Sequence, residues 1–189
     1  MKRQLTKLRN QGYRVIYLDE TMFTRKTVKQ EEWCKPKENF RIEETRLNEP
    51  ALAMLSGIGK ENGLEHFKIY NFSVNTERFI EWLKELRVKT GDDKVALFMD
   101  NLSAHKAEKS IEEMKQLGFR WIWNCTYSPQ YNPIELVFSK VKNAFKNLRA
   151  QKLIGNRQES HEAMVAMAMR SVRKQDIVNC IRHVEDLLK

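Results

Sequence analysis

The sequence is poor in cysteine and has no long apolar run, and each absence excludes a class of protein. Its three cysteines, Cys34, Cys125 and Cys180, are scattered and form no Cys-x-x-Cys pair. Such an odd, dispersed set favours reduced thiols in an intracellular protein over disulfides or a zinc site. The most apolar short run, Ala163–Met169, is far too short to cross a membrane, so no membrane partner is expected. The polar, basic stretch Met1–Asn10 does not fit a signal peptide.

Positive charge is what the sequence has in excess. The 189 residues carry a formal net charge of +9, yet 25 of them are acidic, so charges of both signs are interspersed. This balance predicts a folded basic protein and favours a polyanionic partner such as nucleic acid. The length suits one domain with a sizeable core, and we find no internal repeat or low-complexity segment. On charge alone, a merely cationic protein is the simpler alternative.

Periodicity predicts a mixed α/β order of elements. The expected strands are Tyr13–Leu18, Thr24–Lys35, Ala51–Ile58, Leu64–Phe72, Val95–Met99 and Phe119–Asn124. The expected helices begin near Asn75, at Ser103 and at Ile134, and two more cover 160–172 and 175–188. The helix from Ser103 is expected to continue without a break to Gly118.

Two of the predicted strands end in acidic residues. The strand Tyr13–Leu18 runs into Asp19 and Glu20, and the apolar strand Val95–Met99 runs into Asp100. An uninterrupted apolar run is typical of a strand buried on both faces of a sheet. An Asp that closes such a strand lies at the sheet edge, where these folds place their chemistry. Because adjacent strand residues point to opposite faces, only one of Asp19 and Glu20 can reach a shared site.

The segment Ser128–Glu135 predicts a proline-fixed loop that leads into a helix. Its prolines prevent the segment itself from being helical. A proline in the first turn suits the helix that follows. Glu135 lies off the apolar face of that helix and heads a basic stripe, formed by Lys142, Lys146 and Arg149. An acid beside a row of cations indicates metal chemistry on a phosphate backbone. A solvated helix face with an ordinary first-turn Glu is the alternative.

Asp19, Asp100 and Glu135 together form a carboxylate trio. Mg²⁺ prefers a few carboxylate oxygens plus water and substrate phosphate, without a cage of His or Cys. The trio is therefore suited to hard divalent cations. Three unrelated surface carboxylates are the alternative.

Three blocks of the sequence carry a family resemblance. They are Leu18–Phe23, Met99–His105 and Ser128–Glu135. The blocks resemble the signature blocks of DDE transposases of the Tc/mariner superfamily. Between Asp100 and Glu135 lie 34 residues, the spacing of the mariner-like branch. The segment Trp33–Pro36 also resembles the family's GWxxxG segment, although both glycines are absent here.

The resemblance implies a ribonuclease H-like fold, an α/β domain whose mixed central sheet is flanked by helices. It also implies that Asp19, Asp100 and Glu135 are catalytic and hold two Mg²⁺ or Mn²⁺ ions, and it selects Asp19 over Glu20. The implied reaction is hydrolysis of DNA phosphodiester bonds at transposon ends. The freed 3′-OH is then joined to target DNA, where the family favours TA dinucleotides. Transposon ends and target DNA are therefore the expected partners.

Further residues are second-tier candidates around this trio. Asn101 and His105 follow Asp100 in the same block. His105 is interpreted as a contact to DNA or to a metal-bound water, or else as an exposed histidine in the first turn of a helix. The residues expected to contact DNA phosphates are Lys142, Lys146 and Arg149.

The family pattern also predicts the domain organisation. Mariner-type transposases carry helix-turn-helix domains ahead of the catalytic domain, and nothing before Tyr13 is long enough for one. Residues 1–12 are interpreted as a short basic helix or linker remnant, and 13–189 as a single catalytic domain. DNA recognition then falls to the full transposase, expected as a homodimer, or to a separate recognition subunit.

Two rival functions stay open at this point. One is a structure-selective nuclease on the same fold, and the other is a domesticated, catalytically silent domain that binds DNA or protein. The expected location is the nucleus if the host is eukaryotic, which we favour, and the cytoplasm or nucleoid if it is bacterial.

Overall fold

The computed structural model describes residues 1–24, 27, 49–153, 155 and 159–187. In chain order its elements are α1 (Lys2–Asn10), β1 (Arg14–Phe23), β2 (Leu52–Gly59), β3 (Gly63–Asn71), α2 (Thr76–Thr90), β4 (Val95–Met99), α3 (Ser103–Lys106), α4 (Glu108–Gln116), β5 (Arg120–Trp123), a 3-10 turn (Pro129–Tyr131), α5 (Ile134–Leu153), α6 (His161–Arg170) and α7 (Lys174–Leu187). None of these helices is both long and apolar enough to cross a membrane.

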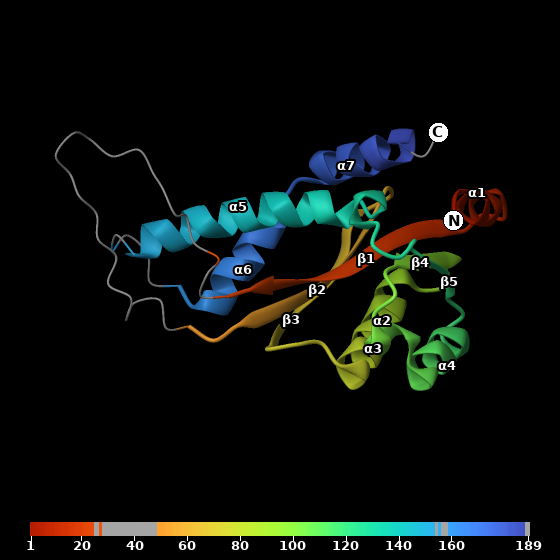
Figure 1. Cartoon of the computed structure of the whole chain (residues 1–189), viewed down its shortest axis with the longest axis horizontal. Coiled ribbons are helices and arrows are strands. Elements are labelled where there is room, and N and C mark those ends of the chain that lie inside the picture. The colour runs from red at the N-terminus through yellow and green to blue at the C-terminus, as the bar shows by residue number, and fades with distance from the viewer. Residues whose placement is uncertain (25–26, 28–48, 154, 156–158, 188–189) are drawn as a thin grey trace.

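The strands form one mixed sheet in the order β3-β2-β1-β4-β5. β1 is antiparallel to β2 and parallel to β4, and β4 is parallel to β5. Helices α5, α6 and α7 cover one face, and α2, α3 and α4 lie on the other (Figure 1). The predicted α/β architecture, a mixed sheet flanked by helices, is therefore confirmed.

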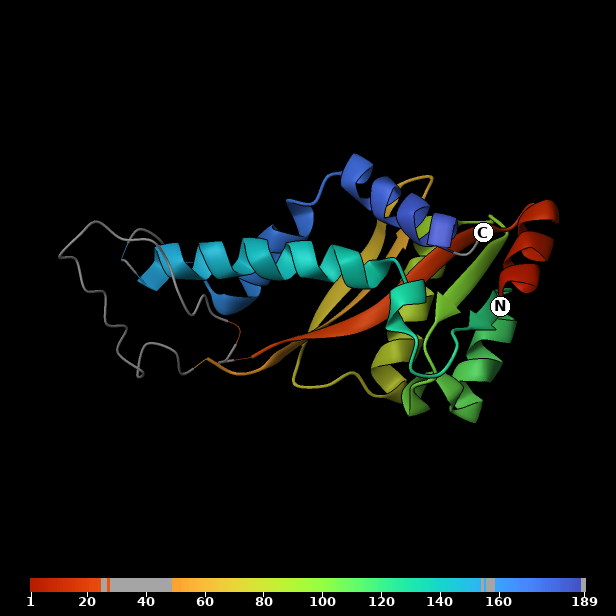
Figure 2. The same ribbon diagram turned by 45° about the horizontal axis from the view of Figure 1, so that its top comes forward.

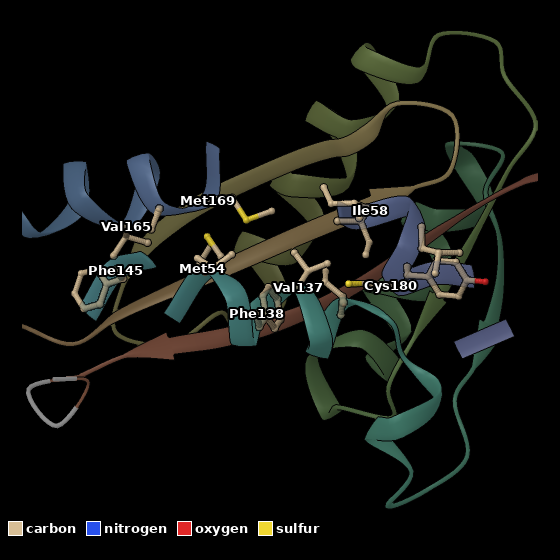
Figure 3. Packing of buried hydrophobic residues seen from close by; sticks show 14 of the residues in the cluster. Met54, Ile58, Val137, Phe138, Phe145, Val165, Met169 and Cys180 are labelled. Atoms are coloured by element: carbon tan, nitrogen blue, oxygen red, sulfur yellow. The ribbon is translucent and has the colours of Figure 1, made fainter. Parts of the chain in front are cut away.

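The larger core lies between the sheet and α5 to α7 (Figure 3). Residues Val137, Phe138 and Phe145 of α5 are buried against Met54 and Ile58 of β2. The apolar periodicity that predicted the α5 helix therefore marks the face that packs on the sheet. This packing fixes the direction in which the first turn of α5 crosses the strand ends.

A second core fills the space between the sheet and α2 to α4. Every residue of β4 is buried, as expected of a central strand with helices on both faces. Alternate β4 residues Val95, Leu97 and Met99 face this second core, and Phe98 faces the first. On α2, Trp82 and Phe79 are fully buried in the same layer.

Helix α1 packs on the body of the domain. Leu5 is buried in the larger core, and Arg9 contacts both the hydroxyl of Tyr17 and the carboxylate of Glu185 in α7. The first residues form a short basic helix, Lys2–Asn10. The C-terminal end of α7 consequently lies next to α1 (Figure 2).

Two predicted elements differ from those observed. β1 does not end before Asp19, because β2 supplies antiparallel partners for it as far as Phe23. The helix from Ser103 is broken at Ala107, whose ψ of 138° is extended backbone, so α3 and α4 are separate. The predicted strand Thr24–Lys35 falls almost entirely outside the described residues.

Candidate active site

The register of the sheet places Asp19 beside Asp100. The parallel strands β1 and β4 are matched as far as the pair Tyr17 and Phe98. Asp19 and Asp100 each lie two residues beyond this last matched pair, just past the point where β1 and β4 stop pairing. Tyr17 faces α5, and Asp19, two residues further along β1, points to that same face. Two carboxylates are thus brought together by strand pairing alone.

Asp19 is nearly buried, at 9% exposure. The backbone N–H of Glu20 donates to its Oδ1 over 2.8 Å, and the side-chain amide of Asn132 donates to its Oδ2 over 3.3 Å. Burial, reinforced by the nearby charges of Asp100 and Glu135, raises the pKa of Asp19 to about 7. The three carboxylates therefore lie close enough to repel one another, although they come from distant parts of the chain.

Asp100 is held by a buried histidine. His105 Nδ1 lies 3.0 Å from Asp100 Oδ1, and His105 Nε2 lies 3.4 Å from Glu20 Oε1 on the opposite side of the ring. The ring also packs against Phe79 at a centroid distance of 4.4 Å. Burial alone lowers the pKa of His105, but its contacts with the two carboxylates outweigh that effect and raise the pKa to about 9.

The observed position of His105 corrects the expectation of an exposed first-turn histidine. Its side chain is fully buried because α3 is a single turn that packs against α2, which brings the ring under the strand end. Glu20 points to the side of the sheet opposite Asp19, and there it contacts this ring. His105 therefore lies behind Asp100, where a ligand on the Asp19 side does not reach it.

Glu135 is in the first turn of α5. Its backbone N–H donates to the carbonyl of Asn132 over 3.1 Å, and its side chain is exposed at the rim of the site. Partial desolvation and the charge of Asp100 raise the pKa of Glu135, and Lys142, further along α5, opposes this shift. An exposed carboxylate of this kind can rotate toward the two aspartates.

The donor set fits a hard cation, because the trio offers only carboxylate oxygens. In the described residues, however, no three side chains of His, Cys, Asp or Glu are converged tightly enough to hold a metal ion. The hydrogen bonds show how the two aspartates are held. Asp19 is bonded to Asn132, and Asp100 is bonded to His105 and to the N–H of Leu102 over 3.3 Å. The aspartates are oriented, while Glu135 stands apart from them.

Asn101 positions the loop that leads to α5. Its Nδ2 donates to the carbonyl of Asn124 over 2.7 Å, just beyond β5. Asn124 in turn donates to the carbonyl of Ser128 over 2.8 Å, and its Oδ1 accepts from the N–H of Cys125 over 2.9 Å. Asn101 thus braces a loop and is not bonded to Asp100, unlike His105.

The basic stripe predicted on α5 is only partly at the surface. Lys142 and Lys146 are partly exposed, whereas Arg149 is 1% exposed. Arg149 donates to the carbonyl of Thr24 over 3.2 Å and pairs with Glu49 at 3.6 Å. Arg149 lies one turn after Phe145 and so continues the buried face of α5. The helical projection of the sequence had placed it on the exposed basic stripe. A phosphate contact by Arg149 is not compatible with this burial.

Asn132 and Asn124 are the residues that sequence reasoning did not single out. Asn132 is 1% exposed, and its Nδ2 donates both to the carbonyl of Leu18 over 3.1 Å and to Asp19. It joins β1 to the start of α5, across more than a hundred residues of chain. The sequence did contain a signal for Asn132. It is a short polar residue directly before the proline that starts the helix, a position suited to local hydrogen bonding.

The fold and the acidic cluster define the class of this protein, an α/β domain whose site lies where two parallel strands end beneath a crossing helix. The family described as DDE superfamily endonuclease matches residues 14–156, most of the chain, and the protein belongs to that family. The membership of a DDE family predicted from the three sequence blocks is thereby confirmed. No curated protein sequence matches the chain.

Solved structures share the fold. The Mos1 transposase paired-end complex with left transposon end matches with a TM-score of 0.71 at 14% identity, over 98% of this chain and 56% of that one. The Mos1 transposase catalytic domain with raltegravir and Mg gives 0.63 at 13% identity, over 98% and 86%. A simian T-cell lymphotropic virus intasome in complex with PP2A regulatory subunit B56 gamma gives 0.59 at 12% identity, over 85% and 48%.

These matches confirm the predicted ribonuclease H-like fold. The Mos1 catalytic domain is matched over most of its length. The chain spans only 56% of the longer Mos1 chain, and so corresponds to one part of such a protein.

Proposed function

We propose that this chain is the catalytic domain of a Tc/mariner-type transposase. It hydrolyses DNA phosphodiester bonds at transposon ends and joins the freed 3′-OH to target DNA. The observation that carries the proposal is the pairing of β1 with β4, which sets Asp19 beside Asp100 just beyond the last matched pair of these parallel strands. Membership of the DDE endonuclease family supports a catalytic role for that pair together with Glu135.

In this proposal Asp19, Asp100 and Glu135 are the catalytic residues and hold two Mg²⁺ or Mn²⁺ ions. When bound, such ions activate the attacking oxygen and stabilise the leaving oxygen of an in-line phosphoryl displacement. Support comes from the all-oxygen donor set and from the mutual repulsion of the three carboxylates, which a cation relieves. The matched Mos1 catalytic domain was obtained with Mg.

The residues around the trio orient it. Asn132 and the N–H of Glu20 fix the two oxygens of Asp19, and His105 fixes Asp100 from behind. Glu135 completes the site by rotating inward from the first turn of α5. The proposal requires neither a histidine base nor a serine nucleophile from this chain, because water or a DNA 3′-OH is the attacking group.

The proposed substrate is DNA, as in the matched Mos1 complex with a transposon end. Lys142 and Lys146 lie on α5 beyond Glu135, on a helix that leads toward the site. They are suited to contacting phosphates, which position DNA without reading its sequence. Recognition of particular transposon ends is therefore assigned to other parts of a full transposase, acting as a homodimer or with a separate subunit.

The test uses the whole chain with supercoiled plasmid DNA. We expect Mn²⁺ or Mg²⁺ to support nicking, a chelator to abolish it, and a 3′-OH oligonucleotide to become joined to the plasmid. Nicking without any joining would favour the structure-selective nuclease. A chain that binds plasmid but neither nicks nor joins it at any metal concentration would favour the catalytically silent domain and contradict the proposal.

A further inference from the structure

Tyr127 is the most exposed large hydrophobic side chain of the described residues, at 97% exposure. Its φ of 54° lies in the left-handed region, which a residue with a bulky side chain rarely adopts. Only Phe72 shares this feature among the described residues other than glycine. Strained backbone of this kind persists where the surrounding structure dictates it, and it clusters at functional sites.

The surrounding structure that dictates it is the loop Asn124–Ser128, here called the Tyr127 loop. Asn124 is only 6% exposed, and its side chain closes the loop by donating to the carbonyl of Ser128 over 2.8 Å. Asn124 also donates its backbone N–H to the carbonyl of Met99 over 2.7 Å. The base of the loop is therefore rigid, and Tyr127 is held outward from it.

The Tyr127 loop is attached to the proposed active site at both ends. At its start, Asn124 is bonded to Met99 and to Asn101, the two residues that flank Asp100. At its end the chain passes through the 3-10 turn into α5, whose first turn carries Glu135 (Figure 2). The Tyr127 loop therefore borders the proposed active site at both of its ends.

We propose that Tyr127 stacks on a nucleobase of the DNA strand next to the phosphate under attack. The apolar face of an aromatic ring is poorly solvated by water, so covering it is favourable. Every nucleobase offers a flat face on which the ring can stack. The contact is therefore independent of base identity, which suits a domain that holds DNA mainly through phosphates. This inference rests on the proposed function, and it names a contact to bases where the carboxylates and lysines contact only phosphates.

The experiment measures binding of the whole chain to a duplex that carries 2-aminopurine near a frayed end. Ca²⁺ replaces Mg²⁺ so that DNA binds while chemistry is slow. With the wild-type chain we expect quenching of the 2-aminopurine fluorescence by stacking. Tyr127→Phe should keep the affinity and the quenching, whereas Tyr127→Ala should weaken binding by about tenfold and lose the quenching.

Phe72→Ala is the matched control. Phe72 is an exposed aromatic residue with a φ of 67° on the loop after β3, so its replacement removes an exposed ring from a comparable backbone conformation away from the Asp100 segment. We expect DNA binding by this variant to equal that of the wild type. Equal loss in both variants would show a general effect of exposed aromatic residues and would contradict a stacking role for Tyr127.

The remaining outcomes separate this inference from the proposed function. If the wild type binds and cleaves DNA and Tyr127→Ala does so equally well, the inference is wrong and the proposed function stands. If Tyr127→Ala instead changes the mass of the chain in sedimentation, the ring packs on a second copy, which also overturns the inference. If the wild type neither binds nor cleaves DNA, both are wrong.

Discussion

The side-chain amide of Asn132 donates to the carboxylate of Asp19 over 3.3 Å and joins the start of α5 to the strand that carries Asp19. The same nitrogen donates to the carbonyl of Leu18 over 3.1 Å, and the carbonyl of Asn132 accepts the N–H of Glu135 over 3.1 Å. One buried residue thus connects two of the three proposed catalytic carboxylates. Its side chain orients Asp19, and its backbone carbonyl holds the turn that carries Glu135.

Replacing Asn132 should therefore affect both stability and activity. Asn132→Ala leaves buried acceptors without their donor, which we expect to lower the free energy of unfolding by about 1–3 kcal/mol. It should also lower the rate of metal-dependent cleavage with less effect on DNA binding, because only the carboxylates lose their orientation. Urea denaturation and cleavage kinetics measure the two effects. Asn143→Ala, at an exposed position of α5, is the control and should change neither.

The raised pKa of Asp19 predicts how the metal-free protein responds to pH. From an ordinary value of 3.8 the pKa rises to about 7 in the fold, so the folded chain disfavours the ionised form. The destabilisation begins as the pH rises above the ordinary value and is complete above about 7. Asp19→Asn should therefore stabilise the metal-free protein by roughly 4 kcal/mol at pH 8, and hardly at all below pH 4.

Divalent cation should reverse that difference. Mn²⁺ should raise the melting temperature of the wild type, because it would bind the folded state and relieve the repulsion, and it should raise that of Asp19→Asn much less. Thermal melts at pH 8 with and without Mn²⁺ provide the measurement. A wild type that is more stable than Asp19→Asn in chelator at pH 8 would contradict the assigned burial of this carboxylate.

The exposed part of the basic stripe predicts a salt-dependent contribution to DNA binding. Replacing Lys142 and Lys146 together by Ala should weaken binding to all sequences alike. It should also flatten the plot of log affinity against log salt concentration by up to about two. Fluorescence anisotropy across a salt series measures this. The control is the double change Lys109→Ala and Lys115→Ala on α4, which removes the same charge from exposed positions. A similar loss in both pairs would show that only net charge matters.

Arg149 is expected to act on stability and not on DNA. Arg149→Met removes the buried guanidinium group that pairs with Glu49. We expect this change to lower the free energy of unfolding by about 3 kcal/mol. Lys152→Met is the matched change, because Lys152 pairs with the same carboxylate at 2.8 Å but its side chain is 30% exposed. That variant should lose under about 1 kcal/mol. Denaturation of both variants tests the contrast, and equal losses would count against it.

The sequence predicted the elements that have strong periodicity. The buried run of β4, the apolar face of α5 and the acidic strand ends were readable because a period of two or 3.6 residues leaves a clear pattern. Proline at the start of α5 fixed the position of Glu135. The order of residues along the chain was therefore enough to propose the trio.

What the sequence did not predict depends on contacts between distant segments. His105 is buried because α3 packs on α2, and Arg149 is buried because Glu49 and the end of β1 meet the far end of α5. Asn132 acts through a carbonyl of β1 that no local pattern connects to it. Polar residues of this kind look like surface residues in a sequence, and only the tertiary packing shows which partners satisfy them.

The central claim is that Asp19, Asp100 and Glu135 act together as the metal-holding unit of a DNA-cleaving site. The most direct measurement is Mn²⁺-dependent nicking of supercoiled plasmid by Glu135→Gln, Asp19→Asn and Asp100→Asn, each checked for folding by thermal melting. Each amide keeps the shape of the side chain and removes the charge that a cation needs. We predict that each change alone abolishes nicking, and that combining any two adds little, because the residues act as a unit. Folded Glu135→Gln that nicks plasmid as fast as the wild type would contradict the account.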